Sequence, residues 1–347
     1  MKLPIQTGIM VLMLLSFFNE SSNAQYASRK ISKKQQAYTD SLKQVEYNYF
    51  FPILGQQAYS RGFDIPYPAG LMANYIWMKQ GIVIENFQLG IQSENVDLPM
   101  TPVDFIDFGY NTNTSYAVNF RPDLWILPFL NVYGLFGYGS STTEVNLTEP
   151  VELKSVVSQN MSTAGFGVMG AFGLGPLFMS VDANWTWTKP ELLQDPVLAK
   201  VLGIRLGKSF VFKNQSNRNI AVWVGGMRAR MNSATLGSVS MVDAIPQETW
   251  DRVDEIVDDY NTWYEGLDPI RQGIVDNSAF PAFIDALDNA EGNTLVHYGM
   301  DKRPEEAWNM VIGGQFQLNK NWMLRSEGGI VGDRKSFLAS VNYRFKI

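Results

Sequence analysis

Hydrophobic and polar side chains alternate along the C-terminal segment SFLASVNYRFKI, residues 336–347. One series is apolar or aromatic and consists of Phe337, Ala339, Val341, Tyr343, Phe345 and Ile347. The polar residues between them include Ser340, Asn342, Arg344 and Lys346. A period of two predicts a β-strand with one apolar and one polar face. Such a strand suits the wall of a lipid-embedded barrel, which has lipid outside and water or polar packing inside.

The same alternation recurs along most of the chain. We predict strands of this kind over residues 129–140, 162–173, 177–188, 219–231, 307–318 and 321–332. In residues 219–231 we expect Ala221, Trp223 and Met227 to face outward. We expect about eight strands from Ser115 to the C-terminus, and two to four more from residues 70–78, 82–92 and 103–110. The total is then about 10 or 12, because barrels of this kind usually have an even number of strands.

The segments between the strands differ in length. Residues 173–176, 213–218 and 319–321 are short and polar, whereas residues 141–161, 189–200 and 232–306 are long. Membrane barrels keep short turns on the periplasmic side and long loops outside. We therefore expect the long segments to be extracellular and the last strand to end at the periplasm.

The N-terminus has the features of a secretory signal peptide. Lys2 supplies the positive charge, Gly8–Phe18 is an apolar core interrupted only by Ser16, and Ser22-Asn23-Ala24 offers small residues for cleavage. This core is shorter than the roughly 20 residues that a spanning helix requires. We therefore predict that residues 1–24 are removed.

Composition narrows the class further. The content of aromatic residues (Phe 21, Tyr 15, Trp 9) favours the interfacial girdles of a barrel. The chain has no cysteine, which excludes disulfides, thiol chemistry and cysteine-ligated metals. A formal net charge of −6 argues against general nucleic-acid binding, which needs a basic face.

With this signal peptide, these strands and this closing strand, residues 70–347 resemble the outer-membrane β-barrel proteins of Gram-negative bacteria. The resemblance implies an all-β, antiparallel transmembrane barrel in the outer membrane, in contact with lipid. It also implies that the barrel-assembly machinery reads the last strand. Ile347 stands where such proteins usually end in an aromatic residue, and Phe345 lies two residues earlier.

A soluble β-sandwich also alternates, but its apolar face packs on another sheet and favours Val, Ile and Leu. In this chain Trp and Tyr lie near both ends of the outward face, which indicates two membrane interfaces. The aromatic residues that we assign to these interfaces are Trp185, Trp187, Trp223, Trp308, Trp322, Tyr343 and Phe345.

Two regions lie outside the predicted wall of the barrel, which we assign to residues 63–347. Residues 25–62 are a basic, then aromatic segment, which we interpret as a periplasmic extension or a lumen plug. Residues 232–306 are predicted to form an extracellular loop with an acidic amphipathic helix over 250–267 and a second helix over 269–275 or 279–288. The apolar stripe of residues 250–267 must pack on the barrel rim, on the second helix or on a protein partner.

The inward faces of the strands carry more arginines than carboxylates. The residues that we expect to line the lumen are Arg121, Asp123, Asp182, Arg205, Arg228, Arg230, Arg325, Glu327 and Arg344. A barrel of about eight strands is filled by side chains, and one of 16–18 encloses an aqueous channel. About 10 to 12 strands lie between these limits, so either internal ion pairs or a narrow pathway for small anions is expected.

The sequence favours a narrow or gated channel for a small solute. The alternatives are a structural or interaction barrel that displays the acidic helical loop, and a hydrophobic-solute channel with an N-terminal hatch. Barrel hydrolases need a histidine base. The chain has one histidine, His297, and no motif places a nucleophile beside it. We therefore expect neither catalysis, nor a metal site, nor a cofactor.

Overall fold

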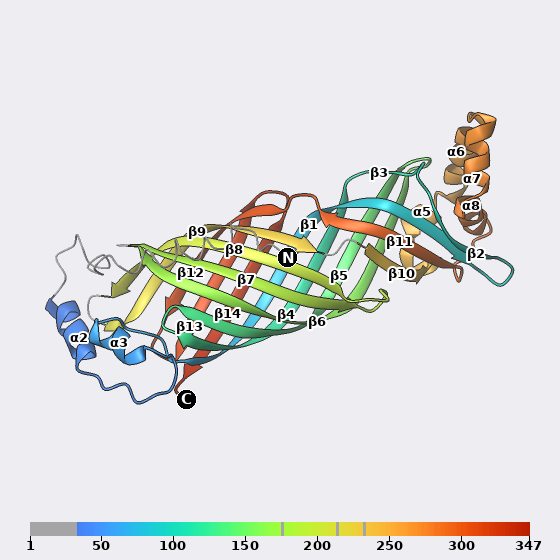
Figure 1. The fold of residues 1–347 in the computed structure, drawn as a ribbon. Helices are drawn as coiled ribbons and strands as arrows, with labels where there is room; N and C mark the ends of the chain where they lie inside the picture. The colour runs from blue at the N-terminus through green and yellow to red at the C-terminus, as the bar shows by residue number, and fades with distance from the viewer. Residues whose placement is uncertain (1–32, 175–176, 213–214, 232–233) are drawn as a thin grey trace, which may run out of the picture.

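A closed β-barrel forms the body of the molecule (Figure 1). The computed structural model describes residues 33–174, 177–212, 215–231 and 234–347, so the predicted signal peptide lies outside the described residues. Ten strands of this part form the wall, in the order β1-β14-β13-β12-β9-β8-β7-β6-β5-β4, and β4 pairs back onto β1. Their bounds are β1 (Ala69–Gln92), β4 (Asn111–Leu127), β5 (Leu130–Glu149), β6 (Leu153–Leu174), β7 (Leu177–Pro190), β8 (Val197–Phe212), β9 (Gln215–Met231), β12 (Trp308–Gln317), β13 (Trp322–Val331) and β14 (Lys335–Phe345).

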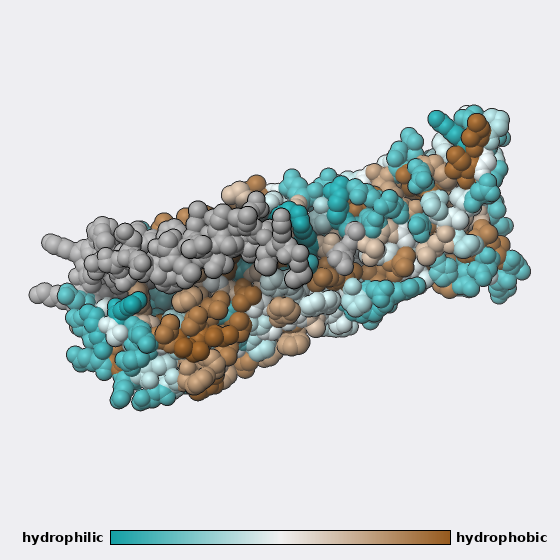
Figure 2. All heavy atoms as spheres, viewed as in Figure 1, coloured by the Kyte–Doolittle hydropathy of each residue, from teal (hydrophilic) through white to brown (hydrophobic). Residues whose placement is uncertain are grey.

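The wall is apolar outside and polar inside. Large hydrophobic side chains such as Val118 and Ile330 are 61% and 62% exposed. On the opposite face of the same sheet, polar side chains such as Asn131 and Asn342 are buried. On the face that Figure 2 shows, hydrophobic residues gather on the left-hand part of the barrel, and hydrophilic residues cover the tip beyond them. This inverted arrangement, with all wall strands paired, is that of an outer-membrane β-barrel and excludes the sandwich alternative.

The total of ten wall strands is one of the two predicted totals, but the strands are built from partly different segments. Residues 70–78 and 82–92 belong to the single strand β1, and only Asp107–Phe108 of residues 103–110 is a strand, β3, which pairs with β5 beyond the wall. Residues 141–161, expected as a long loop, mostly continue β5 and β6 and turn near Pro150. Their alternating Ser, Thr and Val residues suit an extended strand, which explains the continuation.

The far ends of β1, β5 and β6 continue into a second unit, which we call the distal domain. It also contains β2 (Asp97–Pro102), β3, β10 (Ala234–Ser240) and β11 (Leu295–Pro304). Its helices are α4 (Met241–Ala244), α5 (Gln247–Trp250), α6 (Val253–Glu265), α7 (Pro269–Asp276) and α8 (Phe280–Asp288). Buried apolar residues from these elements, including Ile91, Val103, Met241, Ile256 and Leu287, form one core. The distal domain is therefore packed like a small soluble domain.

The predicted helix over 250–267 corresponds to α6 and begins three residues later than expected, because the chain turns at Asp251–Arg252 after Trp250 ends α5. Both alternatives for the following helix are present, as α7 and α8. The apolar stripe of α6 is covered by the distal domain itself: Ile256 and Tyr260 are buried, and the Tyr260 ring lies 5.8 Å from that of Phe280. Among the described residues, no helix has the length and apolar character needed to cross a membrane.

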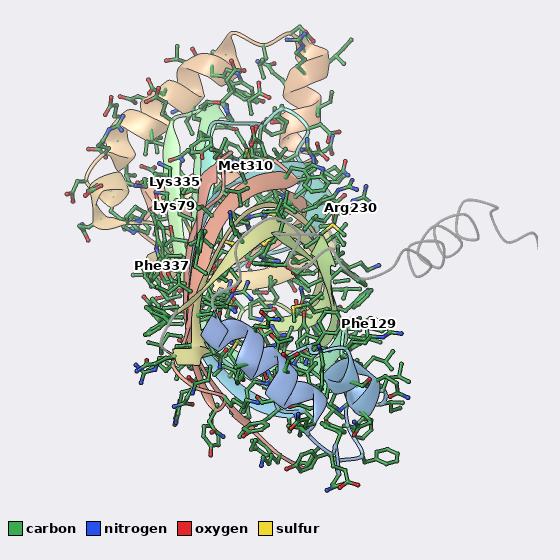
Figure 3. All side chains as sticks on the ribbon, turned by 90° about the vertical axis from the view of Figure 1, so that its left-hand side faces the viewer. Lys79, Phe129, Arg230, Met310, Lys335 and Phe337 are labelled. Atoms are coloured by element: carbon green, nitrogen blue, oxygen red, sulfur yellow. The ribbon has the colours of Figure 1, made fainter. Side chains whose placement is uncertain are left out.

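The opposite end of the barrel carries the helices α2 (Lys33–Lys43) and α3 (Gly55–Ser60), as Figures 1 and 3 show. Leu42, Ala58, Tyr59 and Ile65 form their small core. Residues 33–68, which we call the N-terminal cap, are fixed to the barrel rim by an ion pair of 3.1 Å between Lys320 Nζ and Asp64 Oδ1. Ile53 N also donates to Ile126 O over 2.8 Å. The predicted extension therefore lies at the mouth of the barrel.

We expect Phe136→Arg to lower the free energy of unfolding by about 2 to 4 kcal/mol, because it places a charge against lipid. Phe136 is 54% exposed on the wall strand β5. Unfolding by urea in lipid vesicles measures the effect. Val242→Arg is the matched control, since Val242 is 58% exposed on α4 outside the wall, and we expect a change within about 0.5 kcal/mol. Equal effects of the two variants would contradict the assignment of the lipid-facing wall.

Candidate functional site in the barrel lumen

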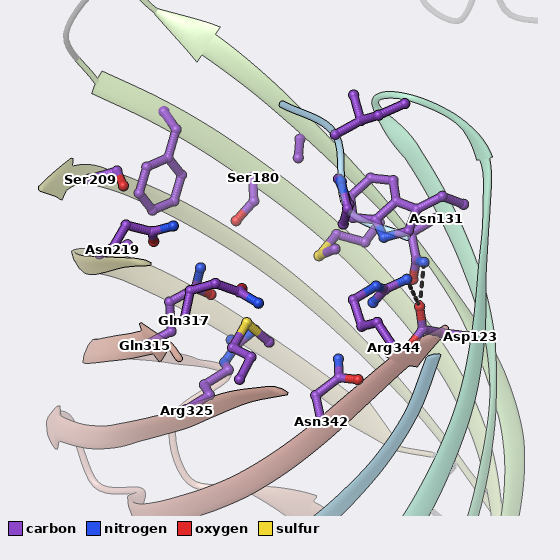
Figure 4. A pocket seen from close by; sticks show the side chains of 18 of the residues that line it. Asp123, Asn131, Ser180, Ser209, Asn219, Gln315, Gln317, Arg325, Asn342 and Arg344 are labelled. Atoms are coloured by element: carbon purple, nitrogen blue, oxygen red, sulfur yellow. Dashed lines mark hydrogen bonds and ion pairs between the residues drawn. The ribbon is translucent and has the colours of Figure 1, made fainter. Parts of the chain in front are cut away.

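The lumen contains a cavity of about 320 Å³ between the N-terminal cap and the middle of the barrel, lined by both polar and apolar side chains. Asp64, Ile65 and Pro66 of the cap line its outer end. Inward residues of the wall strands line the rest, and Figure 4 shows many of them: Asp123, Asn131, Ser180, Ser209, Asn219, Gln315, Gln317, Arg325, Asn342 and Arg344. The neutral amides and hydroxyls can exchange hydrogen bonds with water or with a polar solute.

Glu327 on β13 is the centre of the larger ion-pair cluster. Its carboxylate accepts two hydrogen bonds from Arg205 on β8, at 2.6 Å from Nε and 2.7 Å from Nη2. Glu327 Oε2, which accepts from Arg205 Nε, also accepts from Arg325 Nη2 over 3.1 Å and from Trp223 Nε1 over 2.7 Å. The Arg205–Glu327 pair is bidentate, which gives both strength and a fixed orientation. Because β9 and β12 lie between β8 and β13 in the wall, the Arg205–Glu327 pair connects strands that are not adjacent and so crosses part of the lumen.

A second cluster surrounds Asp123 on β4. Arg344 Nη2 on β14 and Asn131 Nδ2 on β5 both donate to Asp123 Oδ1, each over 2.8 Å. Arg344 also donates from Nε to the backbone carbonyl of Tyr67, over 2.9 Å, and so joins this cluster to the N-terminal cap. All three side chains are buried, so the pair is shielded from bulk water.

Polar bridges connect the two clusters. Arg121 Nη2 donates to Asn131 Oδ1 over 3.3 Å, and the Arg121 guanidinium lies 3.4 Å from the ring centroid of Tyr133. Tyr133 OH donates to Asn184 over 2.7 Å, and Asn184 Nδ2 donates to Asp182 over 2.9 Å. Asp182 pairs with Arg205. These contacts form a chain of partners from β14 to β13, which we call the lumen network.

The charges of the lumen network nearly balance. Four guanidinium groups (Arg121, Arg205, Arg325, Arg344) face three carboxylates (Asp123, Asp182, Glu327). Removal of such groups from water is costly, and close pairing offsets that cost. Two glycines make room for the network, because a Cβ at Gly313 would lie 2.6 Å from the Trp223 ring and one at Gly203 would lie 2.6 Å from Arg205. The excess of one guanidinium leaves the lumen attractive to an anion.

The structure places seven of the nine residues expected to line the lumen inside it, and the lumen network consists largely of these. The other two, Arg228 and Arg230 on β9, are assigned to the wrong face. Arg228 pairs in register with Trp308, which is 50% exposed, and Arg230 pairs with the exposed Lys200. Directly opposed residues of neighbouring strands lie on the same face of a sheet. Arg228 and Arg230 therefore face outward.

The same error affects Trp223, which we expected at the membrane interface. Trp223 is only 4% exposed and bonds to Glu327, whereas Val222 and Val224 face outward. The segment IAVWVGG is apolar on both faces, so alternation alone cannot assign its direction. The large aromatic ring suggested lipid, but the indole N–H has a carboxylate partner in the lumen, which decides the direction.

The remaining interface aromatics lie on the outer face or at its edges. Trp187, Trp308, Trp322 and Tyr343 are 39–50% exposed. Trp185 is half-buried and stacks on Phe166 at 5.4 Å, and Phe345 stacks on Tyr343 at 6.2 Å. The residues expected to line the lumen did not include Asn131, Tyr133 or Asn184, although the predicted directions of their strands place them inward. Because these three side chains are uncharged, nothing in the sequence pattern marked them as partners of the lumen charges.

The structure gives His297 a hydroxyl neighbour that the sequence did not reveal. His297 Nδ1 lies 2.7 Å from Ser238 Oγ, and Nε2 lies 3.3 Å from Gln92 Oε1. The two residues are directly paired across β10 and β11. The amide of Gln92, not a carboxylate, lies against the ring nitrogen that does not face Ser238. In the described part of the chain, no three acidic or histidine side chains come together in a way that could hold a metal ion.

Comparison with known proteins shows only distant similarity. The chain matches no protein-family model and no curated protein. The β domain of the Bordetella autotransporter BrkA aligns with 80% of this chain and 100% of its own, at 10% identity and a TM-score of 0.36. The translocator domain of the autotransporter NalP from Neisseria meningitidis aligns with 83% of this chain and 92% of its own, at 10% identity and a TM-score of 0.32.

An outer-membrane channel from Pseudomonas putida F1 aligns with 81% of this chain and 96% of its own, at 7% identity and a TM-score of 0.28. These identities and scores are too low to transfer the activity of any of the three proteins. The function must be argued from the barrel itself.

We expect Glu327→Gln to lower the free energy of unfolding by about 3 kcal/mol or more, because it leaves the buried Arg325 without its carboxylate and Arg205 with Asp182 alone. Glu85→Gln is the control: Glu85 pairs with Arg303 over 3.0 Å, but both side chains are 52% exposed. For this exposed pair we expect the free energy of unfolding to fall by less than about 1 kcal/mol. Denaturant unfolding in the same vesicles compares the two, and equal losses would show that the lumen network does not hold the barrel together.

Proposed function

We propose that this outer-membrane barrel is a narrow, gated channel for a small solute, and that the lumen network is its gate. The observation that carries the proposal is the position of the network beside a lumen cavity of about 320 Å³ that its guanidinium groups help to line. A solute that enters past the N-terminal cap reaches this cavity before it reaches the Arg205–Glu327 pair. Passage then requires this pair to part.

The chemistry of the cavity supports a small polar or anionic solute. Asn, Gln and Ser side chains line it, together with the four guanidinium groups of the lumen network. Ten wall strands lie between the small barrels that are filled by side chains and the large barrels that enclose a water channel. A small lumen with paired charges would conduct only when these pairs rearrange.

We expect the double variant Arg205→Ser/Glu327→Ser to give discrete, anion-selective conductance steps in planar bilayers, whereas the unmodified protein stays mostly closed. The variant removes the side chains that span the lumen and keeps the other lumen guanidinium groups. Heat-modifiable mobility in gels verifies that each barrel is folded.

The control is Arg303→Ser/Glu85→Ser, which removes an exposed pair outside the lumen. It should conduct like the unmodified protein. If a folded Arg205→Ser/Glu327→Ser barrel shows no more conductance than this control, the channel proposal fails. The lumen network would then be structural filling, and an interaction barrel that displays the distal domain would be the better description.

Deletion of residues 33–62 tests whether the barrier to conductance is the lumen network or the N-terminal cap, which would act as a hatch. The N-terminal cap lies at the mouth, whereas the Arg205–Glu327 pair lies deeper. We therefore expect the deletion alone to leave the conductance low. Conductance that rises to the level of the double variant would identify the cap as the barrier, in favour of the hatch alternative.

A further inference from the structure

The distal domain contains a second cavity, of about 110 Å³, which is partly open and whose walls are mostly apolar. Side chains from β1, β5, β6, β10, β11 and α8 line it, among them Phe87, Val145, Phe283 and Tyr298. The proposed channel does not use this cavity, because its lining residues are all different from those of the lumen cavity.

One residue of the lining is charged. Lys302, on β11, lines the cavity and is partly buried, with its Nζ 5.8 Å from the ring centroid of Tyr298. Within the described ranges, its ammonium group makes no hydrogen bond or ion pair. Its neighbours in sequence are engaged elsewhere, since Arg303 pairs with Glu85 and Asp301 accepts from Asn86 over 2.7 Å.

Three other polar side chains of the lining already have partners. Thr143 accepts from Asn113 over 3.0 Å, and Ser155 donates to the Ala244 carbonyl over 2.9 Å. Gln159 accepts from the Leu192 amide over 3.0 Å. Burial lowers the pKa of Lys302 to about 8, and no carboxylate counteracts this effect. An amino group without a partner beside an apolar cavity is costly to keep charged, so an anionic group at this point would be favourable.

We propose that this cavity binds a small monocarboxylate with an aliphatic or aromatic body. The carboxylate accepts from Lys302 Nζ, and the apolar body lies among Phe87, Val145 and Tyr298. The size of the cavity sets the class: at about 110 Å³ it is smaller than the apolar cavity of roughly 150 Å³ that accommodates benzene, but it is partly open. A chain of a few carbons therefore fits inside, one ring fills the cavity and its opening, and a long acyl chain does not fit. The site stands independently of the channel proposal.

The test uses 4-fluorobenzoate and ¹⁹F NMR on the full-length barrel in lipid nanodiscs, because detergent would compete for an apolar cavity. We expect saturable binding that Lys302→Met weakens at least about tenfold, the equivalent of about 1.4 kcal/mol. Lys302→Met removes the charge and keeps an apolar side chain, so the distal domain should fold. Lys154→Met, at an exposed lysine on β6, is the control and should bind like the unmodified protein.

The dependence on pH identifies the group that binds the carboxylate. Affinity should fall as the pH rises above about 8, because Lys302 then loses its proton while the benzoate stays ionised. Tyr298 is the other titratable side chain in the lining, and burial raises its pKa, so it stays neutral over this range. Lys302→Arg keeps its charge and should bind independently of pH.

Two results would overturn the proposal. One is the absence of saturable binding of 4-fluorobenzoate to the unmodified protein. The other is equal affinity of the unmodified protein and Lys302→Met, which would place the ligand elsewhere, for example in the lumen. The neutral analogue 4-fluorobenzyl alcohol should not distinguish Lys302→Met from the unmodified protein.

Discussion

Closure of the barrel by backbone hydrogen bonds of β1 to strands on both of its sides is the constraint on which the rest of this structure depends. In lipid, an unpaired backbone amide or carbonyl group has no water to bond, so the sheet must have no free edge. Residues 69–79 of β1 meet this requirement by pairing with β14 on one side and β4 on the other. Residues 82–92 of the same strand pair with β11 and β2, so one strand supports both the wall and the distal domain.

Closure with ten wall strands, counted over the described residues, also determines the contents of the lumen. The inward side chains come within contact distance across the barrel, and charged ones must find partners there. Arg205 and Glu327 are neighbours only because the wall curves them toward each other, since β9 and β12 separate their strands. The lumen network is thus a consequence of the radius of the barrel as much as of the sequence.

Alternation predicted most of the wall, because the two faces of a membrane barrel differ strongly in polarity. It located the closing strand, the outward aromatics Trp308 and Trp322, and the inward charges Asp182 and Arg325. It failed on β9, where both faces are apolar and only the hydrogen bond of Trp223 to Glu327 decides the direction.

The other errors have physical causes of the same kind. The strands β10 and β11 were missed because a long helical segment separates them, and their pairing is not local in sequence. The Ser238–His297 contact and the cavity beside Lys302 depend on that pairing, so neither could be inferred from spacing along the chain. The lumen contacts that cross the barrel were hidden for the same reason.

The position of β1 also has a consequence for biogenesis. Its two partner strands on one edge, β11 and β14, are both synthesised long after it, and β14 is the last strand of the chain. Until they arrive, β1 presents a row of unsatisfied amide and carbonyl groups, which is a template for mispairing with other chains. Contacts between segments this distant in sequence also form slowly. The edge of β1 therefore stays open to mispairing until the eleven-residue strand β14 pairs with it.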